Sequence, residues 1–323
     1  MGPAHCNQRT RLRVSRFGAA SPPVTGGIVN VMMFSDRLQL AMFVLIAALL
    51  RSDALVALQQ GQRRLTIAVS PEAISPGDVV RIDVSGAPDE RITATVFDQN
   101  LTFSFDAPHG TWTTLAGVDL ETKPGAYRLR VERDGTQVTT HTIRVLAKQF
   151  RIRRLRVPDT FVNPTADALD QIARDTQALR DVYARATPQR WAGAFIVPVS
   201  GAPTSNFGTR SYYNGRQRSP HAGVDFMSEP GTPIHASNHG TVALAAPLYF
   251  TGNTVIIDYG ARLFSVFAHL SEFRVQAGEI VTPEAIVGLV GATGRVTGPH
   301  LHWSVRLNGA RVDPLSLITA TRQ

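Results

Sequence analysis

Apolar residues alternate with polar ones along much of the chain, which is the period-two pattern of half-buried strands. The pattern starts near Leu65 and returns near residues 80–84 and 92–96. Turn-forming residues separate these runs, and Asp134-Gly135 between two alternating runs predicts a hairpin. About six or seven such strands predict an immunoglobulin-like β-sandwich over residues 58–148.

A helical period follows the predicted sandwich. Apolar residues recur three and four positions apart between Leu169 and Val182, and Thr165 is placed to cap the start of this helix. The basic stretch 151–158 precedes the helix and is expected to form a solvated face. Residues 149–192 are therefore predicted to be a linker with one amphipathic helix.

From Trp191 onward the strand-like pattern returns, and we expect it to continue to Leu317. Residues 193–323 are therefore predicted to form an antiparallel β-sheet domain. The expected fold class is mainly β, with a sandwich, a short helical linker and a C-terminal sheet domain. A length of 323 residues with 43% hydrophobic residues is enough for two modest cores.

The N-terminal part of the chain has the pattern of an export signal. Residues 38–50 are a nearly uninterrupted apolar run of thirteen residues, shorter than the roughly 20 that span a bilayer. Residues 1–57 are predicted to be a leader with a secretory signal peptide. Translation from Met32 or Met33 would exclude residues 1–31, and an uncleaved leader would instead anchor the chain to the membrane. We expect an exported protein of the periplasm or cell envelope, with no stable membrane span once the leader is cleaved.

The net charge restricts the class of partner. The whole chain carries +8, and residues 1–57 hold six arginines and two aspartates, so a chain that begins at Leu58 keeps +4. A modest positive charge favours attraction to anionic envelope polymers. No motif that reads nucleic acid accompanies it, so no nucleic-acid partner is expected. Cys6 is the sole cysteine, which excludes an intrachain disulfide. The oligomeric state is expected to be a monomer.

Two histidine clusters carry the candidate chemistry. His221 and Asp225 are four residues apart, and His300 and His302 are two apart, so each pair would share one face of a strand. Two imidazoles and a carboxylate, with water in the fourth position, are typical of a catalytic zinc site. His221, Asp225 and one of His300 and His302 would bind the metal, which leaves the other histidine free for proton transfer.

A third candidate position, His269, lies between these two clusters. The segment from about Phe195 to Leu317 resembles the lysostaphin/LytM family of zinc metallo-endopeptidases, which cut peptide cross-links of bacterial peptidoglycan. The resemblance implies that His221, Asp225 and His302 bind one zinc ion per chain and that His269 and His300 are the catalytic histidines. The matching stretches include Ser205-Asn-Phe-Gly-Thr-Arg210, His221-Ala-Gly-Val-Asp225, Phe267-Ala-His269, Gly288-Leu-Val-Gly-Ala-Thr-Gly294 and Thr297-Gly-Pro-His300-Leu-His302.

The resemblance implies hydrolysis of peptidoglycan stem-peptide cross-links. Zinc lowers the pKa of a bound water from about 15.7 toward about 7, which makes a nucleophile available at neutral pH. A histidine, with an ordinary pKa of about 6.5, then serves as general acid and base. The pattern leaves open which of His269 and His300 is the base and which cross-link is cut. The alternative is a non-catalytic wall-binding regulator of other hydrolases, a role found among family members that have lost ligands, whereas here every ligand position is filled.

Overall fold

The computed structural model describes residues 65–158, 162–204 and 206–322. The expected leader, residues 1–57 with the apolar run 38–50, lies outside the described residues. Leu65–Gln323 forms one compact unit. Among the described helices, none has the length and apolar character needed to cross a membrane.

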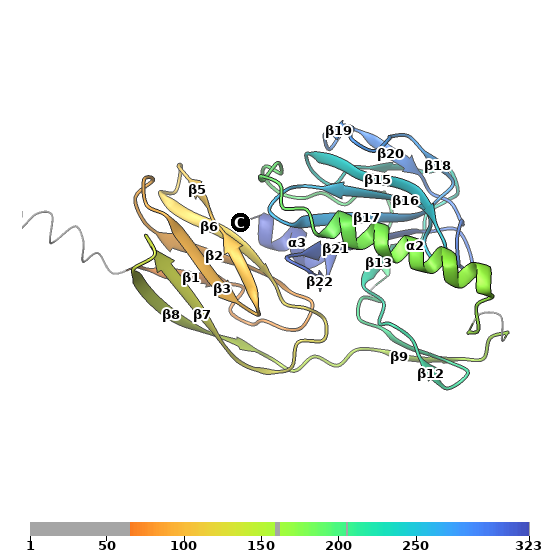
Figure 1. Cartoon of the computed structure of the whole chain (residues 1–323), viewed down its shortest axis with the longest axis horizontal. Coiled ribbons are helices and arrows are strands. Elements are labelled where there is room, and N and C mark those ends of the chain that lie inside the picture. Colours follow the sequence, from red (N-terminus) through yellow and green to blue (C-terminus); the bar gives the residue numbers. More distant parts are fainter. Residues whose placement is uncertain (1–64, 159–161, 205, 323) are drawn as a thin grey trace, which may run out of the picture. The chain divides into compact units, whose positions relative to one another are not determined.

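Eight strands before residue 146 form two four-stranded antiparallel sheets around a shared hydrophobic core. Their bounds are β1 (Ile67–Ser70), β2 (Val79–Ser85), β3 (Ile92–Val96), β4 (Gln99–Thr102), β5 (Ser104–Asp106), β6 (Thr111–Gly117), β7 (Gly125–Arg133) and β8 (Gln137–Val145). One sheet has the order β1-β2-β6-β5 and the other β4-β3-β7-β8 (Figure 1).

The sequence pattern accounts for this sandwich. β2 buries Val80, Ile82 and Val84 at alternate positions, because successive side chains of a strand point to opposite faces. The predicted hairpin is confirmed, since β7 and β8 meet at Asp134 and Gly135, which have positive φ angles of 52° and 71°. Three residues connect the paired Arg133 and Gln137, and a hydrogen bond from Thr136 N to Arg133 O at 3.1 Å closes the turn around Asp134 and Gly135.

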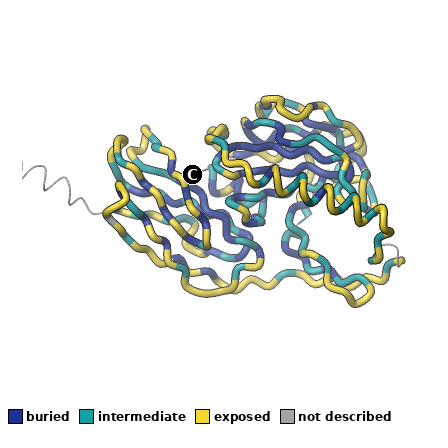
Figure 2. The backbone as a smooth tube through the Cα atoms, in the orientation of Figure 1, coloured by how far each residue is buried: buried dark blue, intermediate teal, exposed yellow. Residues whose placement is uncertain are grey.

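The stretch predicted to be a linker contains a strand and a helix. Strand β9 (Ile152–Leu155) has exposed side chains, as expected for the basic stretch, but the sequence pattern does not predict a strand there. Helix α2 (Ala166–Tyr183) is confirmed, and its N-cap Thr165 accepts a hydrogen bond from the Ala168 backbone N–H at 3.3 Å. Its apolar side packs on a sheet of the C-terminal region, and its outer side is exposed (Figure 2).

The C-terminal region is built on an eight-stranded sheet with the order β10-β13-β21-β17-β16-β15-β19, and β22 pairs with β21. Two three-stranded sheets, β12-β11-β9 and β14-β20-β18, flank it. The bounds are β10 (Pro203–Thr204), β11 (Arg210–Tyr213), β12 (Arg216–Gln217), β13 (Gly223–Phe226), β14 (Pro233–His235), β15 (Gly240–Leu248), β16 (Gly252–Asp258), β17 (Leu263–Leu270), β18 (Glu272–Phe273), β19 (Ile280–Val281), β20 (Ile286–Leu289), β21 (Leu301–Leu307) and β22 (Ala310–Val312).

Strand β21 separates the core from the face that carries the candidate site. Leu301, Trp303 and Val305 are buried in the main core, whereas the alternate residues His302 and Ser304 are half-buried. The strand therefore directs a histidine away from the core while its neighbours hold the sheet in place.

The expectation of strand structure up to Leu317 is wrong. Helix α3 (Pro314–Thr321) begins after Asp313, whose side chain accepts a hydrogen bond from the Leu315 backbone N–H at 2.9 Å. Asp at the N-cap followed by Pro in the first turn is a standard helix start, so the signal was present in the sequence.

Candidate metal centre

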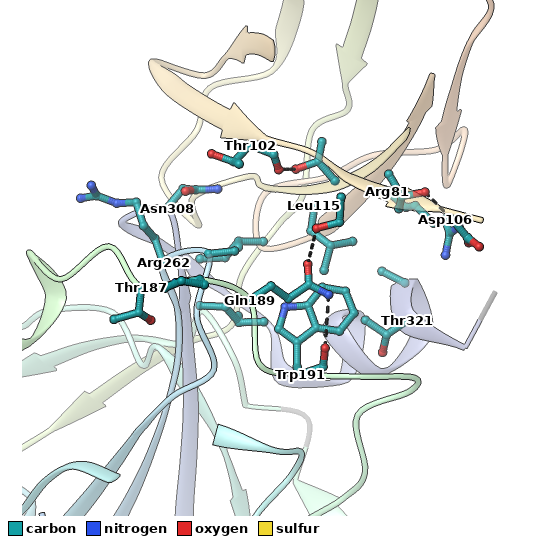
Figure 3. A pocket seen from close by; sticks show the side chains of 18 of the residues that line it. Arg81, Thr102, Asp106, Leu115, Thr187, Gln189, Trp191, Arg262, Asn308 and Thr321 are labelled. Carbon is teal, nitrogen blue, oxygen red and sulfur yellow. Dashed lines mark hydrogen bonds and ion pairs between the residues drawn. The ribbon is translucent and has the colours of Figure 1, made fainter. Parts of the chain in front are cut away.

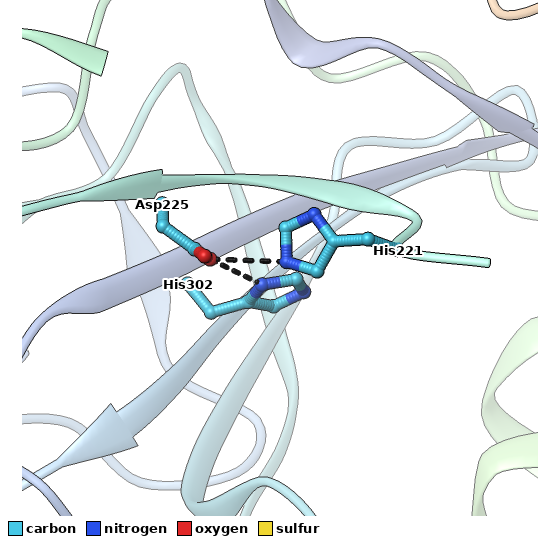
Figure 4. Close-up of side chains that lie close together, drawn as sticks. All are labelled: His221, Asp225 and His302. Carbon is cyan, nitrogen blue, oxygen red and sulfur yellow. Dashed lines mark hydrogen bonds and ion pairs between the residues drawn. The ribbon is translucent and has the colours of Figure 1, made fainter. Parts of the chain in front are cut away.

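Three side chains that could hold a metal ion converge on the sheet face that β21 exposes. The ligand atoms of His221, Asp225 and His302 all lie within 4.8 Å of one another. Asp225 Oδ1 lies 3.1 Å from His221 Nε2 and 2.9 Å from His302 Nδ1. Both rings therefore direct a nitrogen at the same carboxylate oxygen (Figure 4).

Strand pairing brings two of these residues together. Asp225 in β13 lies directly opposite His302 in β21, so their side chains share a face of the sheet. Gly223 is required in this register, because a Cβ on it would lie 2.7 Å from His302 Cε1.

His221 reaches the group by a different route from the expected one. It lies two residues before β13, so shared strand geometry with Asp225 does not place it. Instead, its backbone pairs with the preceding loop: Gly208 N donates to His221 O at 2.7 Å, and His221 N donates to Thr209 O at 3.0 Å. The ring Nδ1 of His221 is buried without a hydrogen-bond partner among the described residues.

Hydrogen bonds orient the Asp225 carboxylate. Asn206 Nδ2 donates to Oδ2 at 2.6 Å, which leaves Oδ1 for the two histidines. Burial alone would raise the pKa of Asp225, but hydrogen bonds with His221 and His302 outweigh it and hold the pKa well below its usual range. Burial lowers the pKa of His302, and the opposing hydrogen bond with Asp225 does not offset it. At neutral pH the group thus offers an ionised carboxylate and a neutral imidazole, which are the forms that bind cations.

His269 and His300 stand beside this group. Their ring centroids are 4.9 Å apart, and His269 lies 6.0 Å from the His302 ring. His269 Nδ1 lies 2.9 Å from Thr293 O, and His300 Nδ1 lies 2.8 Å from Gly298 O. Because a carbonyl can only accept, Nδ1 is the donor in both hydrogen bonds, and Nε2 of each ring is left for other partners. His300 Nε2 lies 3.9 Å from Asp225 Oδ1.

The backbone holds His269 in an uncommon conformation. Its φ angle is +67°, and its backbone N–H donates to Thr251 O at 2.8 Å. Non-glycine residues with such a φ occur often at functional sites, where the surrounding structure enforces them. Burial lowers the pKa of His269 to about 4, so the ring is neutral at neutral pH.

The structure therefore brings together all five residues that the sequence singled out. Sequence reasoning gave no role to Asn206, Thr251, Thr293 and Gly298, which orient them. Asn206 stands in a stretch that carries the family resemblance, and this was the available signal. The other three act through backbone carbonyls, which every residue type has, so the sequence gives no signal for them.

Two cavities differ in their relation to this site. One of about 120 Å³ includes His302 and Ser304 and is bounded by Leu179 and Tyr183 of helix α2. A larger one of about 620 Å³ lies between the sandwich and the C-terminal sheet, where Trp191 is among the lining residues (Figure 3). The larger cavity contains none of the five candidate residues, so cavity size does not locate the chemistry here.

Comparison with known proteins identifies the family. The model of peptidase family M23 matches residues 219–314. The DD-carboxypeptidase/endopeptidase Mpg of Neisseria meningitidis is 39% identical over 101 residues, which are 31% of this chain and 23% of that protein. The peptidoglycan DD-endopeptidase ShyA of Vibrio cholerae is 37% identical over 113 residues, 35% of this chain and 26% of that protein. The matched region thus spans about a quarter of these curated relatives.

A solved structure extends the similarity to most of the described chain. The crystal structure of a Pseudomonas aeruginosa protein assigned to peptidase M23 is 33% identical, with a TM-score of 0.62. The match covers 76% of this chain and 95% of that one, so it includes more than the residues of the family model. Together with the converging histidines and aspartate, this shows that the chain belongs to peptidase family M23.

Proposed function

We propose that this protein is a zinc-dependent endopeptidase that hydrolyses peptide cross-links of bacterial peptidoglycan. The observation that carries the proposal is the convergence of His221, Asp225 and His302, with the rings of His269 and His300 beside them. The substrate is supported by the relatives, which are named as peptidoglycan DD-endopeptidases and a DD-carboxypeptidase/endopeptidase.

The donor set fits zinc. Imidazole nitrogen and carboxylate oxygen are common zinc ligands, and three protein ligands are typical of catalytic sites. Ligand atoms around a tetrahedral zinc ion lie about 3.3 Å apart, given zinc–nitrogen distances of about 2.0 Å. The separations of 3.1 Å and 2.9 Å from Asp225 Oδ1 to the two ring nitrogens are close to that value. We assign one zinc ion per chain to these three residues.

The residues around the ion have separate tasks. Zinc supplies a Lewis acid that polarises the scissile carbonyl and activates water. His269 and His300 each offer Nε2 to accept a proton, and the protonated ring can then donate to the leaving amine. Thr293 O and Gly298 O fix the tautomer of each ring, so that Nε2 and not Nδ1 faces the reaction.

The wider organisation is part of the proposal. Two antiparallel sheets around one core support an immunoglobulin-like domain over residues 58–148, followed by a linker over 149–192 and the catalytic domain over 193–323. Hydrolysis of peptidoglycan requires an exported chain, so we place the protein in the periplasm or cell envelope. The sandwich would serve in targeting or regulation, since its fold alone specifies no chemistry.

Digestion of purified sacculi tests the function. The zinc-loaded full chain is expected to release soluble fragments, and a chelator should stop release until zinc is restored. Mass spectrometry of the fragments identifies the bond that is cut. A chain that binds stoichiometric zinc and sacculi but releases no fragment would instead be a non-catalytic wall-binding regulator.

A further inference from the structure

A small basic sheet adjoins the candidate metal centre. Strand β11 leaves the loop that pairs with the His221 backbone, and β12 returns the chain toward His221. Strand β9 of the linker pairs with β11 in parallel, with Arg153 opposite Ser211 and Leu155 opposite Tyr213. The linker thereby adds a strand to the sheet next to the proposed catalytic residues.

This sheet has a concentrated positive charge. Residues 150–158 and 206–220 contain seven arginines and no acidic residue. Asp159 follows in the sequence and lies outside the described residues. Within the part of the chain that the structure describes, none of the seven arginines forms an ion pair.

Three arginines of this sheet share one face around an aromatic ring. Ser211 and Tyr213 point to the same face of β11, and Arg153 lies opposite Ser211 on that face. Arg216 lies opposite Tyr213, and Arg218 donates its backbone N–H to Ser211 O at 2.9 Å, so both arginines lie on this face as well. Arg153 Nη2 lies 3.5 Å from the Tyr213 hydroxyl, and the Arg218 guanidinium lies 5.8 Å from the Tyr213 ring. The Tyr213 side chain thus contacts two guanidinium groups, one through its hydroxyl and one through its ring, which lowers the entropy that they lose on binding a partner.

We propose that the face formed by Arg153, Arg216 and Arg218 binds free carboxylates of the stem peptides whose cross-link enters the metal centre. Arginine binds carboxylates through two parallel hydrogen bonds. Neighbouring arginines without acidic partners repel one another, and a bound anion relieves this repulsion. A peptide cross-link held at the metal centre would place its neighbouring carboxylates near this sheet. The inference rests on the proposed function and adds that the preferred substrate carries free carboxylates beside the cross-link.

The test compares substrates and matched variants of the full chain. The substrates are soluble cross-linked muropeptides with free carboxylates and the same compounds with these carboxylates amidated. The variant R153Q/R216Q/R218Q removes three charges from the basic sheet. The control R91Q/R128Q/R144Q removes three charges from exposed arginines of the sandwich, which form no ion pair among the described residues.

On the carboxylate substrate, R153Q/R216Q/R218Q is expected to raise KM by about 3- to 100-fold, as three exposed charge pairs allow. Its kcat should stay within about twofold of the wild-type value, because these side chains do not touch the reacting atoms. On the amidated substrate the wild type and both variants should agree. The control should match the wild type on both substrates.

Three outcomes would overturn the proposal: an unchanged KM on the carboxylate substrate, an equal rise on both substrates, or an equal rise in the control variant. Equal binding of a single-stranded DNA oligonucleotide at physiological salt would also overturn it, because the surface would then be a general polyanion site. A wild-type chain that binds the carboxylate compound in preference to the amidated one without cutting it would contradict the proposed function but support the surface.

Discussion

At the residue scale, His302 and His269 should separate metal binding from turnover. His302→Ala removes a proposed ligand, so we expect loss of both zinc and activity. His269→Ala leaves the three ligands in place and should retain zinc while turnover falls by about 10²- to 10⁴-fold, the usual contribution of a general acid or base. Zinc content by atomic absorption and release of fragments from sacculi measure the two properties. The exposed His141→Ala is the control, and normal turnover by His269→Ala would contradict this assignment.

Asn206 tests whether a residue that does not bind metal can tune the site. Its amide holds Asp225 Oδ2 at 2.6 Å and so fixes the direction of Oδ1. Loss of such a supporting hydrogen bond typically weakens metal affinity by about 10- to 100-fold, and we expect this of Asn206→Ala. Competition with a chelator measures the affinity, with the exposed Asn100→Ala as control. Equal affinities of the two variants would show that Asp225 is held without Asn206.

The residues of the site were predictable to different degrees. His302 follows from strand alternation, because it faces Asp225 across β21 and β13. His300 lies one residue before β21 and pairs with Gly291, so the strand alone does not place it. The argument fails in the same way for His221, which lies outside β13 and depends on pairing with Gly208 and Thr209. Pairing between segments distant in sequence sets that position, and no local pattern records it.

At the element scale, helix α2 supports a loop of the candidate site. The buried Asp175 Oδ2 accepts the Tyr249 backbone N–H at 2.7 Å. The same loop continues to Thr251, whose carbonyl holds the backbone of His269 at 2.8 Å. Helix α2 is therefore connected to His269 through the hydrogen bond to Tyr249, the loop from Tyr249 to Thr251 and the hydrogen bond from His269 to Thr251.

The chain provides a matched pair of helix variants for this contact. Gln171 donates to Asp175 at 2.6 Å and Gln177 to Asp181 at 2.8 Å, and the second pair is exposed. Asp175→Ala and Asp181→Ala each lose such an i,i+4 contact, worth about 0.2–0.5 kcal/mol. Asp175→Ala also leaves the Tyr249 N–H without its acceptor, which costs about 1–3 kcal/mol locally.

We therefore expect faster hydrogen exchange at the Tyr249 amide and lower turnover in Asp175→Ala, with both close to wild type in Asp181→Ala. Exchange followed by mass spectrometry and fragment release from sacculi measure the two effects. Equal turnover in the two variants would show that the loop keeps its shape without the helix.

The elements themselves were largely readable from local signals. Helix α2 was predictable because its apolar period and its Thr165 cap are both local. Strand β9 was not, because its polar side chains have no buried face and only its pairing with β11 makes it a strand. A strand that depends on a distant partner has no period of its own to detect.

At the scale of the whole compact unit, a charged contact joins the sandwich to the C-terminal sheet. Asp119 accepts hydrogen bonds from the Arg311 backbone N–H at 2.9 Å, from Nε at 3.0 Å and from Nη2 at 2.7 Å. Burial alone would raise the pKa of Asp119, but the hydrogen bonds from Arg311 outweigh it and lower the pKa. Because the folded pKa lies below the unfolded one, the stabilisation is complete above about pH 4 and is lost as the pH falls through the folded pKa.

Asp119→Ala should accordingly lower the free energy of unfolding by about 1–3 kcal/mol at pH 7, the cost of removing hydrogen bonds to a charged partner. The deficit should shrink as the pH falls from about 4 toward the folded pKa of Asp119, because the unfolded chain then binds a proton that the folded carboxylate does not. Urea unfolding of the full wild-type and variant chains at pH 7 and at a pH below about 4 measures the difference in free energy of unfolding. Glu132→Ala, which removes the exposed pair with Arg130, is the control and should cost less than about 1 kcal/mol. A cost for Asp119→Ala no larger than that of the control, or one independent of pH, would mean that packing alone joins the two parts.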